Sequence, residues 1–204
     1  RSLTPLTTSV NGSFTAAAGS DSYLVVRTAD GILTSSPVNG TTYTAGGTLG
    51  EGTVVQASGA ISFTSSGLTS GTLYYFHVFS MNSLCSGGPL YLTTSPLVGS
   101  VTTAPNPPAS ITATAISASQ IDLTTIANVA GNDIMIAWNT VNTFGTPSGS
   151  YNPGDPITGG GTVLNIAPAG TSNHTGLIQG TQYYYRAWSV AGGIYSSSNV
   201  NANA

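Results

Sequence analysis

The stretch GLTSGTLYYFHVFS (residues 67–80) returns in altered form as GLIQGTQYYYRAWS (residues 176–189). The two stretches begin 176 − 67 = 109 residues apart, close to one β-sandwich module of about 100 residues. A second landmark has the same offset, because EGTVV (51–55) corresponds to GGTVL (160–164). The 204-residue chain is therefore predicted to contain two modules of one architecture.

Short runs rich in β-branched and aromatic residues alternate with clusters of Gly, Pro, Asn and Ser along the whole chain. No stretch has apolar residues at helical spacing, so the sequence predicts an all-β fold. Seven strands are expected in each half, at residues 3–10, 13–17, 22–28, 52–57, 61–65, 73–81 and 90–102, and at 110–117, 120–127, 133–139, 161–166, 172–177, 182–190 and 195–200. The expected modules span residues 1–103 and 109–204, and a proline-rich linker at 104–108 joins them because successive prolines cannot continue a β-ladder.

Charged residues make up only 4% of the chain, against about 25% in ordinary soluble domains. The three basic residues are scattered arginines, whereas nucleic acids and anionic membranes bind clustered Lys and Arg, so both are excluded as partners. Nothing predicts membrane insertion either, since no run of 18 apolar residues occurs. Weak repulsion between copies favours self-association. The alternative is a secreted domain that Ser, Thr, Asn and Gly keep in solution.

The repeated stretch carries the pattern Leu-x-x-Gly-Thr-x-Tyr once in each half. The residues are Leu68, Gly71, Thr72 and Tyr74, then Leu177, Gly180, Thr181 and Tyr183. This pattern resembles the E–F corner of fibronectin type III and related immunoglobulin-like modules of bacterial cell-surface proteins. The resemblance implies two tandem immunoglobulin-like (fibronectin type III-like) β-sandwiches, in which the corner tyrosine bonds its hydroxyl to the upstream backbone. It says little about function.

The chain departs from the family pattern in two respects. Neither half has a tryptophan in its expected second strand, where fibronectin modules usually carry one. The first half also has a long insertion at about residues 30–52, which resembles insertions in fibronectin-like repeats of bacterial surface proteins.

Alternation along the strands at 73–81 and 182–190 assigns their side chains to two faces. One face, with Tyr74, Phe76, Val78, Tyr183, Tyr185 and Ala187, is expected in the cores. The other carries four candidate interface residues, Tyr75, Phe79, Tyr184 and Trp188. Exposed aromatic side chains often mark protein contacts. The alternative is that a neighbouring loop or the long insertion covers them within the same subunit.

The N-terminal segment at residues 1–10 is expected to form an edge strand, because Pro5 cannot donate a ladder hydrogen bond. Its candidate donor residues are Leu3, Leu6 and Val10. Such a strand pairs within its own module or completes a neighbouring copy by strand addition, and both arrangements are open.

No residue pattern predicts catalysis, a cofactor or a metal site. His77 and His174 lie in different halves, and neither stands at ligand spacing from another His, a carboxylate or the lone Cys85. The acidic residues fall beside turns or at a strand start, and none pairs with another as acid and base.

Three sequons make Asn11, Asn39 and Asn173 candidate glycosylation sites. Two of the three contain Asn-Gly, which a tight turn would also select.

These features predict a non-enzymatic structural subunit of an extracellular bacterial fibre or pilus-like filament on the cell surface. Copies of the chain would assemble into a homopolymer through donor-strand exchange by the N-terminal segment and through the aromatic sheet faces. The alternative is a binding or spacer module of a secreted adhesin or carbohydrate-active enzyme, for which surface glycans would be partners. A chain that starts at Arg1 without a Met is expected for a processed or trimmed product.

Overall fold

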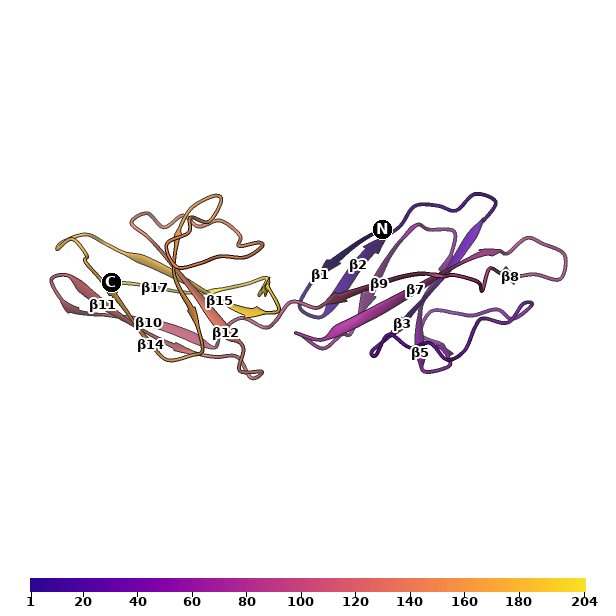
Figure 1. The fold of residues 1–204 in the computed structure, drawn as a ribbon, viewed down its shortest axis with the longest axis horizontal. Helices are drawn as coiled ribbons and strands as arrows, with labels where there is room; N and C mark the ends of the chain where they lie inside the picture. Colours follow the sequence, from indigo (N-terminus) through magenta and orange to yellow (C-terminus); the bar gives the residue numbers. More distant parts are fainter. The chain divides into compact units, whose positions relative to one another are not determined.

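The computed structural model describes residues 1–204, which divide into two compact units, Arg1–Thr103 and Ala104–Ala204. All regular elements are β-strands, drawn as arrows in Figure 1. In the first unit they are β1 (Ser2–Pro5), β2 (Ser9–Ser13), β3 (Ser22–Thr28), β4 (Thr48–Leu49), β5 (Gly52–Ser58), β6 (Ser62–Ser66), β7 (Leu73–Asn82), β8 (Leu90–Tyr91) and β9 (Leu97–Thr102). In the second unit they are β10 (Ser110–Ser117), β11 (Gln120–Ile126), β12 (Asp133–Asn139), β13 (Thr162–Ala167), β14 (Thr171–Thr175), β15 (Tyr184–Ala191), β16 (Ile194–Tyr195) and β17 (Val200–Asn203).

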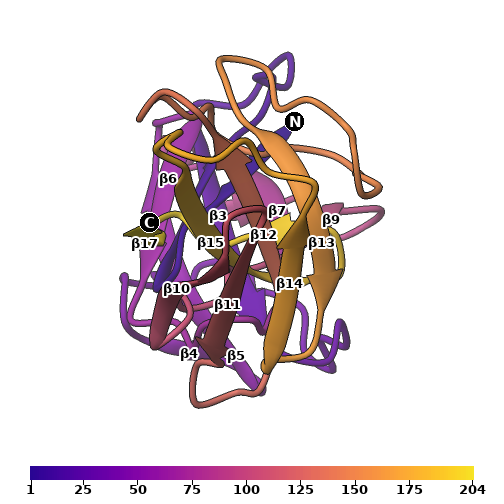
Figure 2. The same cartoon turned by 90° about the vertical axis from the view of Figure 1, so that its left-hand side faces the viewer.

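Each unit is a sandwich of a small and a large antiparallel sheet. In the first unit the small sheet has the order β1-β2-β6, and the large sheet runs β4-β5-β3-β7, with β8 and β9 both paired to β7. In the second unit β10-β11-β14 form the small sheet, visible side by side in Figure 2, and β13-β12-β15 form the large one, with β16 and β17 on β15. The predicted fold class, two tandem immunoglobulin-like (fibronectin type III-like) sandwiches, is confirmed.

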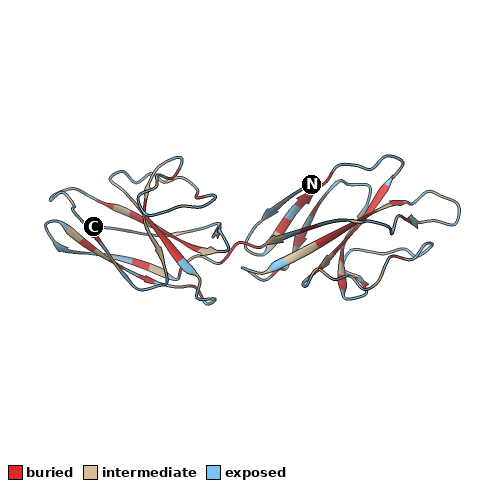
Figure 3. Cartoon of the chain, viewed as in Figure 1, coloured by how far each residue is buried: buried red, intermediate tan, exposed pale blue.

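The core between the sheets contains the residues that alternation assigned to it. Phe76 and Val78 belong to the first core, and Tyr183, Tyr185 and Ala187 belong to the second. Tyr74 packs against the first core and is partly buried. Red segments in Figure 3 mark the buried residues of these strands.

Three expected strands are each divided in the structure. The one at 195–200 separates into the end of β16 and the start of β17, and residues 196–199 lie in no strand. The segment at 3–10 is a hairpin, because the backbone N–H of Leu6 donates to the carbonyl of Ser9 at 2.8 Å and turns β1 back onto β2. Pairing along β2 ends at Ser13, so no strand forms over 14–17. The segment at 90–102 separates into β8 and β9, since Ser95 has a φ of 55° and Pro96 has no N–H to donate.

A long connection covers the outer face of the large sheet in each unit. Residues 29–51 join β3 to β5, and residues 140–161 join β12 to β13. Only the first of these is predicted from the sequence as an insertion. The first connection contributes Leu49 to an apolar cluster with Leu24, Val26, Val54, Phe79, Met81 and Tyr91. The second contributes Ile157 to a cluster with Met135, Ala137, Val163 and Trp188.

The expectation that Phe79 and Trp188 lie on a water-facing surface is therefore wrong. Phe79 is 2% exposed and Trp188 is 3% exposed, because the connections pack over them. The alternative, that a neighbouring loop or the long insertion covers these rings within the same subunit, describes the structure: the insertion covers Phe79, and the second connection covers Trp188. Each unit consequently has two apolar layers, one between its sheets and one beneath its connection.

Specific contacts hold both connections in place. In the first unit the hydroxyl of Tyr91 donates to the carbonyl of Thr41 at 2.8 Å, and the ring of Tyr91 lies 5.7 Å from that of Tyr43. In the second, the Phe144 ring lies 6.4 Å from the Trp188 ring. The guanidinium carbon of Arg186 lies 4.9 Å from the centre of the same Phe144 ring.

We expect Phe79→Ala to lower the free energy of unfolding of the first unit by about 3–5 kcal/mol, because it empties a buried ring site. Urea denaturation of the full chain, with the two units followed as separate transitions, measures this loss. Val38→Ala, an exposed site in the same connection, is the control and should change the value by less than about 0.5 kcal/mol. A small effect of Phe79→Ala on unfolding combined with loss of self-association would contradict a core role.

Candidate functional site

The repeated stretches form the same hydrogen-bonded corner in both units. The hydroxyl of Tyr74 accepts the backbone N–H of Thr69 at 3.1 Å, and the hydroxyl of Tyr183 accepts that of Ile178 at 3.1 Å. Gly71 and Gly180 have φ values of 64° and 75°, which favour glycine.

The remaining corner residues close the turn or fill it. Leu68 is buried in the first core, and Leu177 packs against the second. The Thr72 hydroxyl donates to the carbonyl of Ser70 at 3.2 Å. The backbone N–H of Thr181 donates to the carbonyl of Ile178, also at 3.2 Å. These residues hold the loop between strands and provide no reactive group.

The N-terminal segment is paired within its own unit. Leu3 lies in β1 and is partly buried, Leu6 lies in the turn and is 40% exposed, and Val10 is fully buried in β2. The three candidate donor residues thus occupy two strands and a turn. Of these two strands only β1 lies at an edge of the sheet, because β2 lies between β1 and β6.

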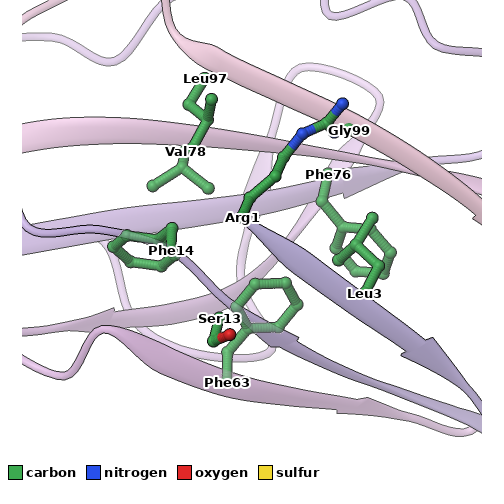
Figure 4. Close-up of a pocket in the computed structure, with 9 residues that line it drawn as sticks. All are labelled: Arg1, Leu3, Ser13, Phe14, Phe63, Phe76, Val78, Leu97 and Gly99. Carbon is green, nitrogen blue, oxygen red and sulfur yellow. The ribbon is translucent and has the colours of Figure 1, made fainter.

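A small cavity lies where β1 meets the large sheet of the first unit. Figure 4 shows Arg1, Leu3, Phe14, Phe76 and other residues around it. The Arg1 side chain occupies the space over Gly99, where a Cβ atom would collide with the guanidinium. The cavity measures about 10 Å³, no more than one water molecule needs, so it offers no ligand site.

Every tyrosine, phenylalanine and tryptophan residue of the chain is buried or partly buried. Of the candidate interface residues, Tyr75 and Tyr184 are partly buried, and Tyr75 packs its ring against Gly31 of the first connection. Sugar platforms and protein hot spots present aromatic rings at the surface. The structure brings the four candidate interface residues onto no common exposed surface.

The three sequon asparagines are exposed. Asn39 lies in a turn with Gly40 at a φ of 79°, as an Asn-Gly pair predicts. Asn11 instead lies within β2, where the turn explanation is wrong. Gly12 is required there because a Cβ atom would collide with the ring of Phe63.

Both histidines are buried and hydrogen-bonded within their own units. His174 Nδ1 lies 3.0 Å from the Tyr185 hydroxyl, and burial lowers the pKa of His174 while it raises that of Tyr185. His77 Nε2 lies 3.3 Å from the Thr28 hydroxyl; burial lowers its pKa, and the charge of Glu51 opposes this shift. Both side chains are sequestered from substrates.

The two perturbed carboxylates are engaged locally. The Thr34 hydroxyl and backbone N–H both donate to Glu51, and these bonds lower its pKa. The backbone N–H of Ser83 donates to Asp21 at 2.8 Å and is the main cause of its lowered pKa. No group of three or more His, Cys, Asp and Glu residues is placed to hold a metal ion. The chain also forms no helix of the length and apolarity that a membrane crossing needs.

Comparisons with known proteins yield structural likeness alone. No family model matches the chain, and neither does any curated protein. A two-domain fibronectin type III segment of chicken tenascin has a TM-score of 0.45 at 16% identity, covering 100% of this chain and 95% of that one. An Fn3-like protein from Clostridium thermocellum has a TM-score of 0.37 at 23% identity, covering 50% of this chain and 92% of that one. The central fibronectin-III array of RIM-binding protein has a TM-score of 0.30 at 14% identity, covering 100% and 66%. Likeness at this level carries no argument about function, and the fold class rests on the strand pairing described above.

Sequence reasoning missed two features. The second connection was detectable, because Asn139 to Gly161 is nearly as long as Thr28 to Gly52. The surroundings of Arg27 could not be detected from the sequence, since they depend on side chains that meet between two sheets.

We expect Tyr74→Phe to lower the free energy of unfolding of the first unit by about 1 kcal/mol, because the N–H of Thr69 loses its acceptor. Tyr75→Phe is the matched control, since it removes a neighbouring hydroxyl that makes no hydrogen bond in the chain. Urea unfolding measures both variants. Equal losses would contradict a specific role for the corner bond.

The free energy of unfolding should fall as the pH drops from 7.5 to 5.5. Burial holds the pKa of His77 and His174 below the unfolded value of about 6.5, so the unfolded chain takes up protons first as the pH falls. The loss stops once the pH is below the native pKa values. Urea unfolding across this range measures the slope, and a double His77→Gln, His174→Gln variant should flatten it. An unchanged slope in that variant would contradict the assignment.

Proposed function

We propose that the chain is a non-enzymatic structural module of an extracellular surface protein. The observation that carries this proposal is that each unit packs Phe79 or Trp188 beneath its own connection and hydrogen-bonds its buried histidine internally. A module of this kind supplies length and a surface without chemistry. The tandem fibronectin-like fold and the scarcity of charge fit this role.

The outward face of the small sheet in the first unit supports an assembly or spacing role. Its exposed side chains are all hydroxyl or amide groups, namely Ser2, Thr4, Asn11, Ser13, Ser62, Thr64 and Ser66. They carry neither charge to repel another copy nor apolar area to aggregate. Dense packing on a surface or in a fibre would tolerate such a face.

A second candidate function is a subunit of a bacterial fibre or pilus-like filament that assembles by exchange of β1. The observation that favours it is the weak attachment of this strand. β1 has four residues, pairs only with β2 and has no fully buried side chain, since Leu3 and Pro5 are only partly buried. Self-pairing and pairing with a sister copy therefore differ little in contact energy, although self-pairing has an effective concentration on the order of millimolar.

A disulfide that locks β1 onto β2 tests the exchange. Thr4 and Asn11 are cross-strand partners, so Thr4→Cys, Asn11→Cys in a Cys85→Ser background should form a bridge that prevents exchange. Under oxidising conditions we expect monomers by light scattering and no filaments by negative stain, with assembly restored by reductant. The single variant Thr4→Cys with Cys85→Ser is the control.

Filaments that persist in the oxidised double variant would exclude β1 exchange. A parent chain that stays monomeric in both redox states would leave the spacer module as the function and would also exclude polymerisation through β1.

A further inference from the structure

Arg27 is a partly buried cation that forms no ion pair. It lies near the end of β3, and its Nη1 donates to the Ser65 hydroxyl at 2.9 Å and to the Ser66 carbonyl at 3.5 Å. Its guanidinium carbon lies 5.5 Å from the centre of the Tyr74 ring. Both hydrogen bonds come from one nitrogen, so the other N–H groups of the guanidinium have no partner in the chain. Because burial removes hydration, such a charge normally has a counter-ion.

The second unit shows that the sandwich does not require a cation at this position. Arg27 pairs with Phe76 across β3 and β7, and Trp138 pairs with Tyr185 at the same place in the second unit. The Trp138 ring packs 4.7 Å from the ring of His174. An aromatic side chain therefore closes this position there, and the fold does not explain why the first unit places a guanidinium in it.

Arg27 also borders a cavity of about 210 Å³ between β5 and β6. The cavity wall carries hydroxyl groups and no carboxylate; its polar residues besides Arg27 are Thr53, Thr64, Ser65 and Ser66. Thr53 is the cross-strand partner of Arg27, so the two side chains lie on the same face of the sheet. The Thr53 hydroxyl has no hydrogen-bond partner in the chain. A free guanidinium edge and a free hydroxyl thus lie side by side at one opening.

We propose that this cavity binds the carboxylate of a uronic acid, with the Arg27 guanidinium on the carboxylate and the surrounding hydroxyls on the sugar. The planar guanidinium matches a carboxylate in a two-point hydrogen bond. One cation in a chain of net charge −3 suits a monoanion better than a phosphate dianion. The cavity is smaller than the roughly 300–1,000 Å³ of pockets for drug-sized ligands, which favours a single sugar over a peptide segment.

The chain offers a direct readout, because it contains only three arginines. In an arginine-selective ¹⁵Nε–¹H spectrum of the full chain, titration with sodium D-galacturonate should shift the Arg27 signal saturably and leave the Arg186 signal in place. D-galactose, which lacks the carboxylate, should shift neither. Sodium acetate should bind at least about tenfold more weakly than galacturonate, since it lacks the sugar hydroxyls.

Two variants distinguish a loss of galacturonate binding from a loss of folding. Arg27→Lys keeps the charge but removes the planar fork, and Thr53→Val keeps the β-branched shape but removes the hydroxyl. Each should weaken galacturonate binding at least about fivefold, measured by backbone amide shifts, with an unchanged melting temperature expected for Thr53→Val. Arg1→Lys is the matched control and should bind like the parent.

The proposal is overturned if the Arg27 shift does not saturate, if Arg1 shifts in parallel, or if acetate binds as tightly as galacturonate. Tighter binding of an acetyl-Gly-Glu-Gly-amide peptide than of galacturonate would also overturn it, in favour of a protein partner. These results are independent of filament formation, so the site and the proposed structural role succeed or fail separately.

Discussion

The central strands of each large sheet are apolar on both faces, and the rest of each unit is arranged to cover them. In β3 every residue except Arg27 is buried, and in β12 the four residues from Ile134 to Ala137 are buried. A strand that is apolar on both faces cannot leave either face in water, whereas many antiparallel sheets have one face exposed to solvent. The small sheet covers one face and the long connection covers the other. The sheet thus requires the long connections at residues 29–51 and 140–161, because they cover its apolar outer face.

Because of this constraint, the aromatic residues Phe79 on β7 and Trp188 on β15 have a core role and not an interface role. Alternation places Phe79 and Trp188 opposite the main core, and in a two-layer sandwich that face would meet solvent. The connection makes a third layer, so these rings add to stability within one chain. Association between copies cannot then use these two rings. The surface features left for it are the hydroxyl and amide face of the small sheet in the first unit, the short edge strand β1 and scattered exposed aliphatic side chains such as Leu84 and Val129.

The chain stabilises its polar groups with few charges. Tyr74 and Tyr183 anchor their corners through hydroxyls, and Tyr91 fixes the first connection in the same way. Arg186 lies over a ring in place of a carboxylate. Neutral hydrogen bonds and ring contacts respond little to salt, in contrast to surface ion pairs. Arg27 likewise lies over the Tyr74 ring, and its remaining N–H groups, which have no partner in the chain, are the basis of the ligand proposal.

The sequence by itself determined the all-β class, the two repeats and the two tyrosine corners, because these depend on local periodicity and on turn residues close in sequence. β3, β10 and β12 begin and end where the pattern of apolar residues predicted. Only the tertiary structure decided which apolar face was covered, because residues 29–51 meet Phe79 through contacts distant in sequence. The same holds for Arg27, whose neighbours come from β5, β6 and β7. The β1–β2 hairpin is different, because its turn is closed by a local hydrogen bond from Leu6 to Ser9 that the pattern of apolar residues does not reveal. Local pattern specifies strands, but packing between layers specifies exposure.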